Sequence, residues 1–144
     1  MLLYGASEEV SAWVSKQIFQ DYSRFKGAEA IGVVHNNKII CGVTYEDFQY
    51  NTSGKPFSCE MSIASIDKRW ATRHNLRAFF KYPFIQLALE RVWTRCSVKS
   101  EGVIMTAKRL GFKQEGVHPK GHHSGDDLMT LGLLKEDCRW IKWD

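Results

Sequence analysis

The fold is decided by residues 63–112, IASIDKRWATRHNLRAFFKYPFIQLALERVWTRCSVKSEGVIMTAKRLGF. Ile63–Ile66 has the character of an apolar strand end, and Asp67–Thr72 that of a polar, basic turn. From Arg73 onward apolar residues recur at helical spacing, and Arg91–Val98 then alternates as a strand does. A strand, a crossover helix and a second strand within about 35 residues predict a βαβ unit with parallel strands. In such a unit a ligand sits where the first strand passes into the helix N-terminus.

The composition is that of an ordinary globular protein. With 144 residues, 44% hydrophobic and 25% charged, the chain is sized for one domain (1–144) with a real core. No apolar run approaches the ~18 residues of a membrane span, and the N-terminal sequence MLLYGASEEV lacks the features of a signal peptide. We therefore expect a cytoplasmic protein with no membrane association.

Charge and cysteine spacing narrow the possible partners. Lysine and arginine exceed aspartate and glutamate by 20 − 16 = +4, which suits an anionic cofactor or nucleic acid and is also common on solvated surfaces. The four cysteines are scattered without a CxxC motif, so we expect reduced, mostly buried thiols and no metal site. The adjacent His122 and His123 lie in a loop bounded by glycines, and we expect them to point apart in solvent rather than to bind metal.

The flanking segments predict a mixed α/β sheet. Ser7 is expected to cap a helix with one apolar face, ending near Tyr22–Lys26. That face comprises Val10, Trp13, Val14, Ile18 and Phe19. The strands expected outside the βαβ core are Ala28–Val34 and Lys38–Tyr45, joined at His35-Asn36-Asn37, then Phe57–Ile66, Lys113–His118 and Leu128–Leu134, with loops at Asp47–Pro56 and Gly121–Asp127. An antiparallel meander feeding a βαβ unit, followed by a helix and a hairpin, gives a mostly antiparallel twisted sheet with helices on both faces.

Two further expectations concern the long helical stretch and the C-terminus. Pro83 predicts a kink or a break after Tyr82. Trp140 and Trp143 either pack on the sheet or cover a neighbouring subunit, and the chain is expected to be a monomer or a homodimer.

Three segments carry a resemblance to a known family. ALERVWTRCSVKSEGVIMTAKRLGFKQEGV (88–117) contains a strand, a helix start, an LGF motif and a following Glu115-Gly116. It resembles the GNAT acetyltransferase superfamily, in the branch that contains ribosomal-protein N-acetyltransferases. RWATRHNLRAFFKYPF (69–84) and DDLMTLGLLKEDCRW (126–140) resemble phage or prophage-type relatives more specifically. The resemblance covers roughly residues 28–140.

The resemblance implies an acyl-CoA-binding fold that uses acetyl-CoA. The pantetheine arm would pair with the end of the Phe57–Ile66 strand, at Ile63, Ala64 and Ser65. The pyrophosphate would lie over the helix start, where unpaired amides and the helix dipole favour anions. The residues implied there are Trp70, Thr72, Arg73, His74 and Asn75, with added charge from Arg69. The family loop usually contains two glycines, whereas this loop contains none.

Acetyl transfer to an amine requires a proton acceptor, an oxyanion donor and often an acid for the thiolate. Glu60 is our candidate base, with Glu46 and Asp47 as alternatives that also suit a cationic substrate; the competing interpretation of Glu60 is an outward-facing strand residue. A backbone amide near Ile63–Ala64 would bind the oxyanion. Ser100 is expected to cap the following helix and to touch the pantetheine amide.

The general acid that would protonate the leaving thiolate is missing from the two positions where relatives usually carry it. Relatives often carry a tyrosine at about the position of Ala107, and the ribosomal-protein branch carries a serine where this chain has Val103. Proximity and orientation alone can still drive aminolysis of a thioester.

Three functions remain open at this stage. The first is an N-acetyltransferase acting on a protein N-terminus, a lysine or a small-molecule amine. The second is a catalytically silent binding module of the same fold, directed at a host or phage protein in the host cytoplasm. The third is an RNA- or tRNA-directed role, suggested by the basic run Lys68–Arg77. The acceptor pocket is expected from the loops Tyr22–Ala28, Asp47–Pro56 and Pro119–Asp126.

Overall fold

A twisted seven-stranded sheet in the order β1-β2-β3-β4-β5-β7-β6 organises the computed structural model, which describes residues 1–142. The strands are β1 (Leu2–Leu3), β2 (Glu29–His35), β3 (Lys38–Tyr50), β4 (Pro56–Ser65), β5 (Arg91–Ser97), β6 (Lys113–His118) and β7 (Leu128–Leu134). The helices are α1 (Ser7–Phe19), α2 (Arg73–Lys81) and α3 (Glu101–Leu110), with short helical turns η1 (Lys68–Trp70), η2 (Tyr82–Gln86), η3 (Lys135–Asp137) and η4 (Arg139–Ile141). The predicted mixed, mostly antiparallel sheet is confirmed.

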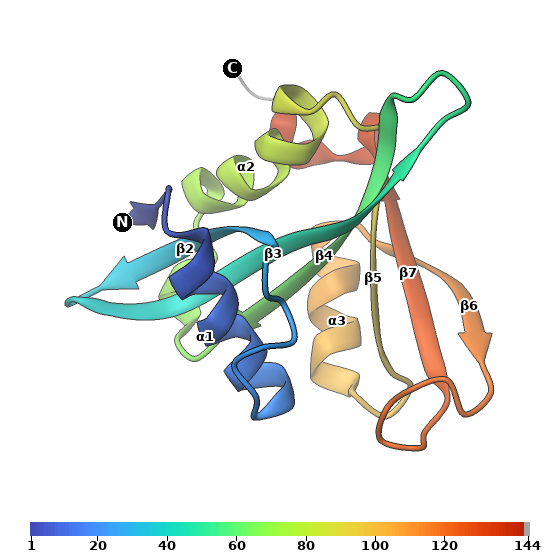
Figure 1. Ribbon diagram of the computed structural model, residues 1–144, viewed down its shortest axis with the longest axis horizontal. Coiled ribbons are helices and arrows are strands. Elements are labelled where there is room, and N and C mark those ends of the chain that lie inside the picture. The colour runs from blue at the N-terminus through green and yellow to red at the C-terminus, as the bar shows by residue number, and fades with distance from the viewer. Residues whose placement is uncertain (143–144) are drawn as a thin grey trace.

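The predicted βαβ unit is formed by β4, α2 and β5. These two strands run parallel, and within residues 1–142 their pairing is confined to Ser58–Glu60 against Arg91–Trp93. Beyond that short ladder β4 and β5 diverge, and Figure 1 shows them spreading apart toward their carboxyl ends. The sheet therefore has an opening in its middle.

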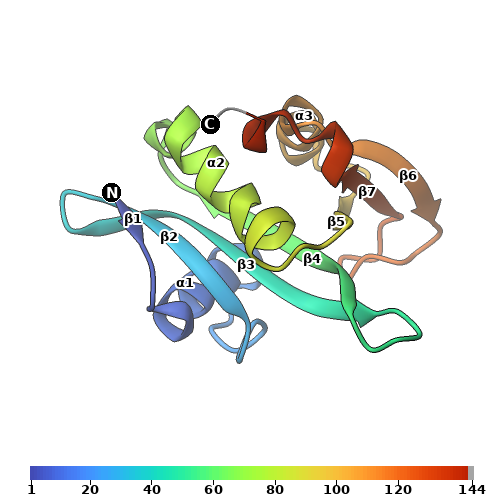
Figure 2. The same ribbon diagram turned by 90° about the horizontal axis from the view of Figure 1, so that it is seen from above.

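Helices cover both faces of the sheet, as predicted. Figure 2 shows α1 on one side and α2 with α3 on the other. On the α1 side, a Cβ on Gly42 would lie 2.4 Å from a methyl carbon of Val14, so only glycine lets the helix pack this close to β3. Val10 and Val14 are fully buried in that contact.

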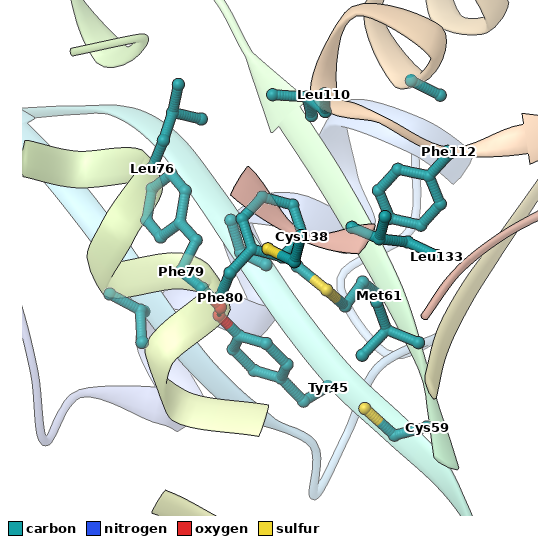
Figure 3. Packing of buried hydrophobic residues seen from close by; sticks show 14 of the residues in the cluster. Tyr45, Cys59, Met61, Leu76, Phe79, Phe80, Leu110, Phe112, Leu133 and Cys138 are labelled. Carbon is teal, nitrogen blue, oxygen red and sulfur yellow. Dashed lines mark hydrogen bonds between the residues drawn. The ribbon is translucent and has the colours of Figure 1, made fainter. Parts of the chain in front are cut away.

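The larger core lies between the sheet and the α2/α3 layer. Figure 3 shows aromatic side chains of α2 meeting Tyr45 of β3 and Met61 of β4. The hydroxyl of Tyr45 donates a hydrogen bond to the carbonyl of Phe79 at 2.6 Å, which satisfies its one buried polar group. Aromatic residues of the α2 segment are therefore core residues, and all four cysteines are buried and unpaired.

The start of α1 differs from the prediction. Ser7 does not cap the helix; its hydroxyl accepts from the amide of Ala30 at 3.0 Å and donates to Glu29, so it ties α1 to β2 instead. The helix ends at Phe19, earlier than expected, and Ile18 is 39% exposed rather than part of the packed face. Ser11 and Ser15 of α1 are also buried, and the hydroxyl of Ser15 accepts from the amide of Arg24 at 2.9 Å, which ties the helix to the segment that follows it.

The predicted loop at Asp47–Pro56 is wrong in its first part. β3 continues to Tyr50, because a bulge at Asp47, with φ 54°, absorbs one residue and lets pairing with β4 resume at Gln49. The connection begins only at Asn51, whose side-chain oxygen accepts from the amides of Ser53 and Lys55.

The break at Pro83 is confirmed: α2 ends at Lys81 and a π-helical turn follows at Tyr82. At the C-terminus Trp140 packs against the core, and its indole nitrogen donates to the carbonyl of Leu110 at 2.8 Å. Trp143 lies outside the described residues. No helix within residues 1–142 is long and apolar enough to span a membrane.

Candidate active site

Glu60 lies at the point where β4 and β5 separate. It is the last β4 residue paired with β5, opposite Trp93, and on its other side it pairs with Glu46 of β3. Cys59 and Met61 belong to the core on the α2/α3 side, whereas Ala64 packs against the α1 cluster. Side chains alternate along a strand, so Glu60 points toward the α1 side of the sheet, away from the larger core.

The carboxylate is buried but not isolated. Glu60 is 3% exposed, and Arg95 donates to it from Nε at 2.9 Å. Burial raises the pKa of Glu60 to about 7; Arg95 opposes that rise, and Glu46 and Asp47 add to it. Burial also raises the pKa of Glu46, again opposed by Arg95. Two carboxyl groups therefore share one guanidinium, and Glu60 exchanges its proton near neutral pH.

Backbone amides of β4 face the opening. The carbonyl of Phe57 accepts from Glu90 on the β5 side, and the amide of Ile66 donates to Ile40 on the β3 side. Because backbone groups alternate between the two sides of a strand, odd-numbered residues of β4 turn their amides toward β5. Past the last paired residue these are Met61, Ile63 and Ser65.

The predicted cofactor residues of β4 therefore divide into two groups. Ile63 and Ser65 present their amides to the opening, whereas Ala64 turns its amide toward β3, where it pairs with Gly42. Met61, which the sequence interpretation did not include, presents the first amide beyond the short ladder. In the sequence only one feature marks Met61: it stands two positions before Ile63, on the same edge of the strand. That spacing becomes informative once the strand pairing is known.

The segment between β4 and α2 is held mainly by its own side chains. Thr72 caps α2 and accepts from the amide of Asn75 at 3.1 Å, and Asn75 donates from its side chain to the carbonyl of Trp70 at 3.0 Å. The ring of Trp70 is buried and stacks on Phe79 at 6.2 Å. Trp70 and Asn75 thus shape the turn from inside, and four consecutive residues at this helix start are exposed, namely Ala71, Thr72, Arg73 and His74.

Arg69 is bound within the turn. It contacts the carboxylate of Asp67 at 2.5 Å and the Nε2 of His35 at 2.8 Å. Hydrogen bonds from Arg69 hold the pKa of Asp67 well below its usual range, so this carboxylate stays ionised and offsets the arginine's charge. Beside it lies a cavity of about 370 Å³, lined in part by Arg69, Thr72 and His74.

The start of α3 lies at the carboxyl end of β5, across the opening from α2. Ser100 occupies the N-cap position, but its side chain makes no capping hydrogen bond, so the expected cap is not formed by its hydroxyl. Val103 is exposed, and Ala107 is buried in the core. The two helix positions where an acid was sought therefore hold no proton donor.

A second cavity lies at the amino end of β2 and the bulge of β3. It measures about 260 Å³ and is lined by residues 26–29 and 45–48, including Glu29, Glu46 and Asp47. The loop that carries His122 and His123 approaches α1, since the ring of His123 lies 5.0 Å from that of Phe19. The expectation that these histidines point apart is wrong: the centres of their rings lie 4.1 Å apart, with the ring planes tilted by 35°.

No protein-family model matches the chain, and no curated protein matches it in sequence. Solved structures do match. The ribosomal-protein-S5-alanine acetyltransferase from Vibrio fischeri is 19% identical, with a TM-score of 0.64 over 78% of this chain and 64% of that one. A GNAT-family acetyltransferase from Bacillus anthracis is 17% identical, with a TM-score of 0.62 over 90% and 87% of the two chains.

A chimera of the spermidine N-acetyltransferase SpeG from Vibrio cholerae and hSSAT matches over 99% of both chains, at 14% identity and a TM-score of 0.70. The chain has the GNAT acetyltransferase fold. At these identities the likeness concerns architecture, and it spans just under two thirds of the Vibrio fischeri enzyme. The opening between β4 and β5 and the helix starts beside it are features of this chain's own geometry, from which a function has to be argued.

Proposed function

We propose that the chain acts as one N-acetyltransferase domain, which transfers an acetyl group from acetyl-CoA to an amine. The observation that carries the proposal is the buried Glu60 at the opening between β4 and β5, where backbone amides of β4 have no strand to pair with among residues 1–142. A proton acceptor that exchanges near pH 7 beside a row of amide donors is what amine acetylation requires. The finer resemblance to phage-type relatives belongs to the same proposal.

The residues present fit the cofactor in two places. The amides of Met61, Ile63 and Ser65 form an open strand edge, which a chain with amide groups such as pantetheine completes as an added strand does. Arg73 and His74 stand exposed at the start of α2, where the helix dipole favours phosphate. Side chains replace the glycine-rich backbone contact in this chain, since the turn contains no glycine.

Of the remaining predicted cofactor residues, Trp70 and Asn75 support the helix start from inside, and the exposed Thr72 caps it. Ala64 packs against α1, which supports the strand rather than the ligand. Ser100 lies across the opening, at the start of α3, where its uncommitted hydroxyl suits an amide of the pantetheine arm. Each of these assignments is part of the proposal.

Bound at this edge, acetyl-CoA supplies an activated acetyl thioester. Glu60 accepts the proton that the amine loses as it attacks, directly or through a water molecule. Of these amides, that of Met61, the one next to Glu60, donates to the oxygen that becomes negative, and those of Ile63 and Ser65 remain for the pantetheine arm. No acid stands at Val103 or Ala107, so the leaving thiolate takes its proton from solvent.

The acceptor amine approaches from the α1 side, toward which Glu60 points. The cavity lined by Glu29, Glu46 and Asp47 lies beside Glu60's strand partner on that side. Its three carboxylates, against the one amine of Lys26, suit an acceptor that carries positive charge. The solved structures of similar fold include acetyltransferases named for a ribosomal protein and for spermidine, and both classes of amine belong in the first assay.

A catalytically silent binding module is the second candidate. One observation favours it: the turn beside α2 contains the ionised Asp67, which opposes a phosphate and offsets Arg69. If this function holds, CoA binds weakly or not at all.

The test measures acetyl transfer to a peptide α-amine, to a lysine-containing peptide blocked at its N-terminus, and to spermidine, with product mass as the readout. We expect Glu60→Gln to lower turnover about 10²-fold while CoA affinity is kept. An unchanged rate removes Glu60 as the base. We expect Arg73→Glu combined with His74→Glu to abolish CoA binding, and unchanged affinity refutes the assignment of the phosphate position.

A further inference from the structure

Arg95 occupies a position that the reaction outlined above does not yet use. It is the second β5 residue beyond Trp93, the last residue of β5 that pairs with β4. From this diverging arm of β5 it reaches back across the opening and donates to Glu60 at 2.9 Å. The ion pair therefore joins β4 and β5 close to the point where the two strands separate.

The guanidinium is held from one side and open on the other. Its carbon lies over the Trp93 ring, 5.7 Å from the ring centre, within the range of a cation–π contact. The side chain of Arg95 is 54% exposed, whereas that of Glu60 is 4% exposed. Arg95 is thus the polar group through which the buried carboxylate meets solvent.

The charges that face Glu60 come from two strands, β3 and β5. From β3 come Glu46 and Asp47, which raise its pKa, and from β5 comes Arg95, which lowers it. On β4 itself, the Cys59 side chain points to the opposite face of the sheet. Burial raises the pKa of the Cys59 thiol, and the carboxylate of Glu60 adds a smaller rise. His122, in the loop between β6 and β7, lies close enough to Arg95 for the arginine to lower the histidine's pKa. Arg95 is the one cation among the groups that act on Glu60 in the part of the chain described here.

We propose that Arg95 is a positioning residue for the acetyl-transfer reaction: its ion pair, at the point where β4 and β5 separate, aims the Glu60 carboxylate at the incoming amine and keeps it ionised. This inference rests on the proposed function. Without Arg95, Glu60 faces only the carboxyl groups of Glu46 and Asp47, which favour the protonated form. A protonated Glu60 cannot accept the amine's proton, so loss of Arg95 converts an active base into an inactive one at neutral pH.

The decisive experiment compares Arg95→Gln with Arg95→Lys and with a matched control, Arg91→Gln. Arg91 lies on the same strand and also forms an arginine–carboxylate pair, with Glu115 at 2.7 Å. Turnover is measured from pH 5.5 to 9.5 for the wild type and these three variants. In parallel, the Glu60 carboxyl is titrated by NMR on ¹³C-labelled protein without substrate, with Glu60→Gln used to assign its signal.

We expect the acidic limb of the rate profile, near pH 7 in the wild type, to move up by at least about one pH unit in Arg95→Gln. At pH 7, where Glu60 of the wild type is half ionised, this variant should lose about fivefold or more in turnover and recover most of it at pH 9. Arg95→Lys should restore the limb in part, and Arg91→Gln should leave it in place. The NMR titration should move in the same direction and by a similar amount.

A limb and an NMR titration that stay in place in Arg95→Gln overturn the proposal, even if the rate falls, because a merely structural role lowers the rate at every pH. The proposed function and the role of Arg95 can fail independently of each other. If no amine is acetylated by the wild type, the proposed function fails, while the NMR titration still shows whether Arg95 controls the charge of Glu60.

Discussion

Replacing Glu60 by glutamine should stabilise the protein at alkaline pH. Burial raises the pKa of Glu60 from its ordinary value of 4.5 to about 7, so the fold prefers the protonated carboxyl. The stability that this preference contributes is fully present below pH 4.5 and is lost as the pH rises through 7. At 1.36 kcal/mol per pH unit, the loss amounts to about 3 kcal/mol. Glutamine has the shape of the protonated acid and carries no such penalty.

The assay is urea unfolding of wild type and Glu60→Gln at pH 4.5 and at pH 8.5. The two should unfold at similar urea concentrations at pH 4.5, and the variant should be the more stable by about 3 kcal/mol at pH 8.5, with an unchanged dependence on urea. In thermal unfolding this corresponds to roughly 10 °C. A variant that is less stable than the wild type at pH 8.5 refutes the reasoning, because the Arg95 ion pair would then outweigh burial.

A control isolates the effect of burial. Glu115→Gln removes a carboxylate from an exposed ion pair with Arg91, and exposed pairs contribute about 1 kcal/mol or less. We expect this variant to differ little from wild type at either pH. Stabilisation by Glu60→Gln together with loss of turnover would mark Glu60 as a residue kept for chemistry at the expense of stability.

Three further predictions concern the fold and the site. Gly42→Ala places a Cβ 2.4 Å from Val14 and should destabilise the protein by about 1–3 kcal/mol in urea unfolding. The control, Gly102→Ala, lies at an open helix position and should stabilise the protein by up to about 1 kcal/mol. Equal effects of the two variants contradict the packing of α1 on β3. Thr72→Ala removes the side-chain cap of α2, so it should lower the free energy of unfolding by about 1 kcal/mol and weaken CoA binding. Unaltered stability would show that the cap does not stabilise the helix. As Glu60 ionises, the logarithm of the wild-type turnover should rise by one per pH unit below about pH 7 and level off above it. A rate that is independent of pH from 5.5 to 9 excludes this base.

Much of the fold is predictable from the sequence because its signals are local. The β6–β7 hairpin has the predicted strand bounds, Lys113–His118 and Leu128–Leu134. Pro83 ends α2 within a residue of the expected place, since a proline ring excludes the backbone hydrogen bond there. Where the prediction failed, a non-local contact was responsible: Ser7 serves β2 instead of capping its helix, and pairing with β4 extends β3 through the bulge at Asp47.

The candidate site is less predictable for the same reason. Glu60 can be singled out as a strand carboxylate in the βαβ unit, but the side to which it points follows from packing against two separate layers. Arg95 escapes sequence reasoning altogether, because its partner lies 35 positions earlier and the register that joins them is a tertiary property. Trp70 shows the opposite case: a residue expected beside phosphate places its ring in the core.

The most direct test of the central claim is calorimetric titration of the purified protein with acetyl-CoA and with CoA at pH 7.5. The opening between β4 and β5 and the start of α2 predict one binding site per chain with a micromolar dissociation constant, lost in the Arg73→Glu, His74→Glu double variant. Binding at 100 times the dissociation constant should also stabilise the fold by about 2.7 kcal/mol. No heat and no thermal shift at millimolar acetyl-CoA would contradict the account and leave the fold with a binding role alone.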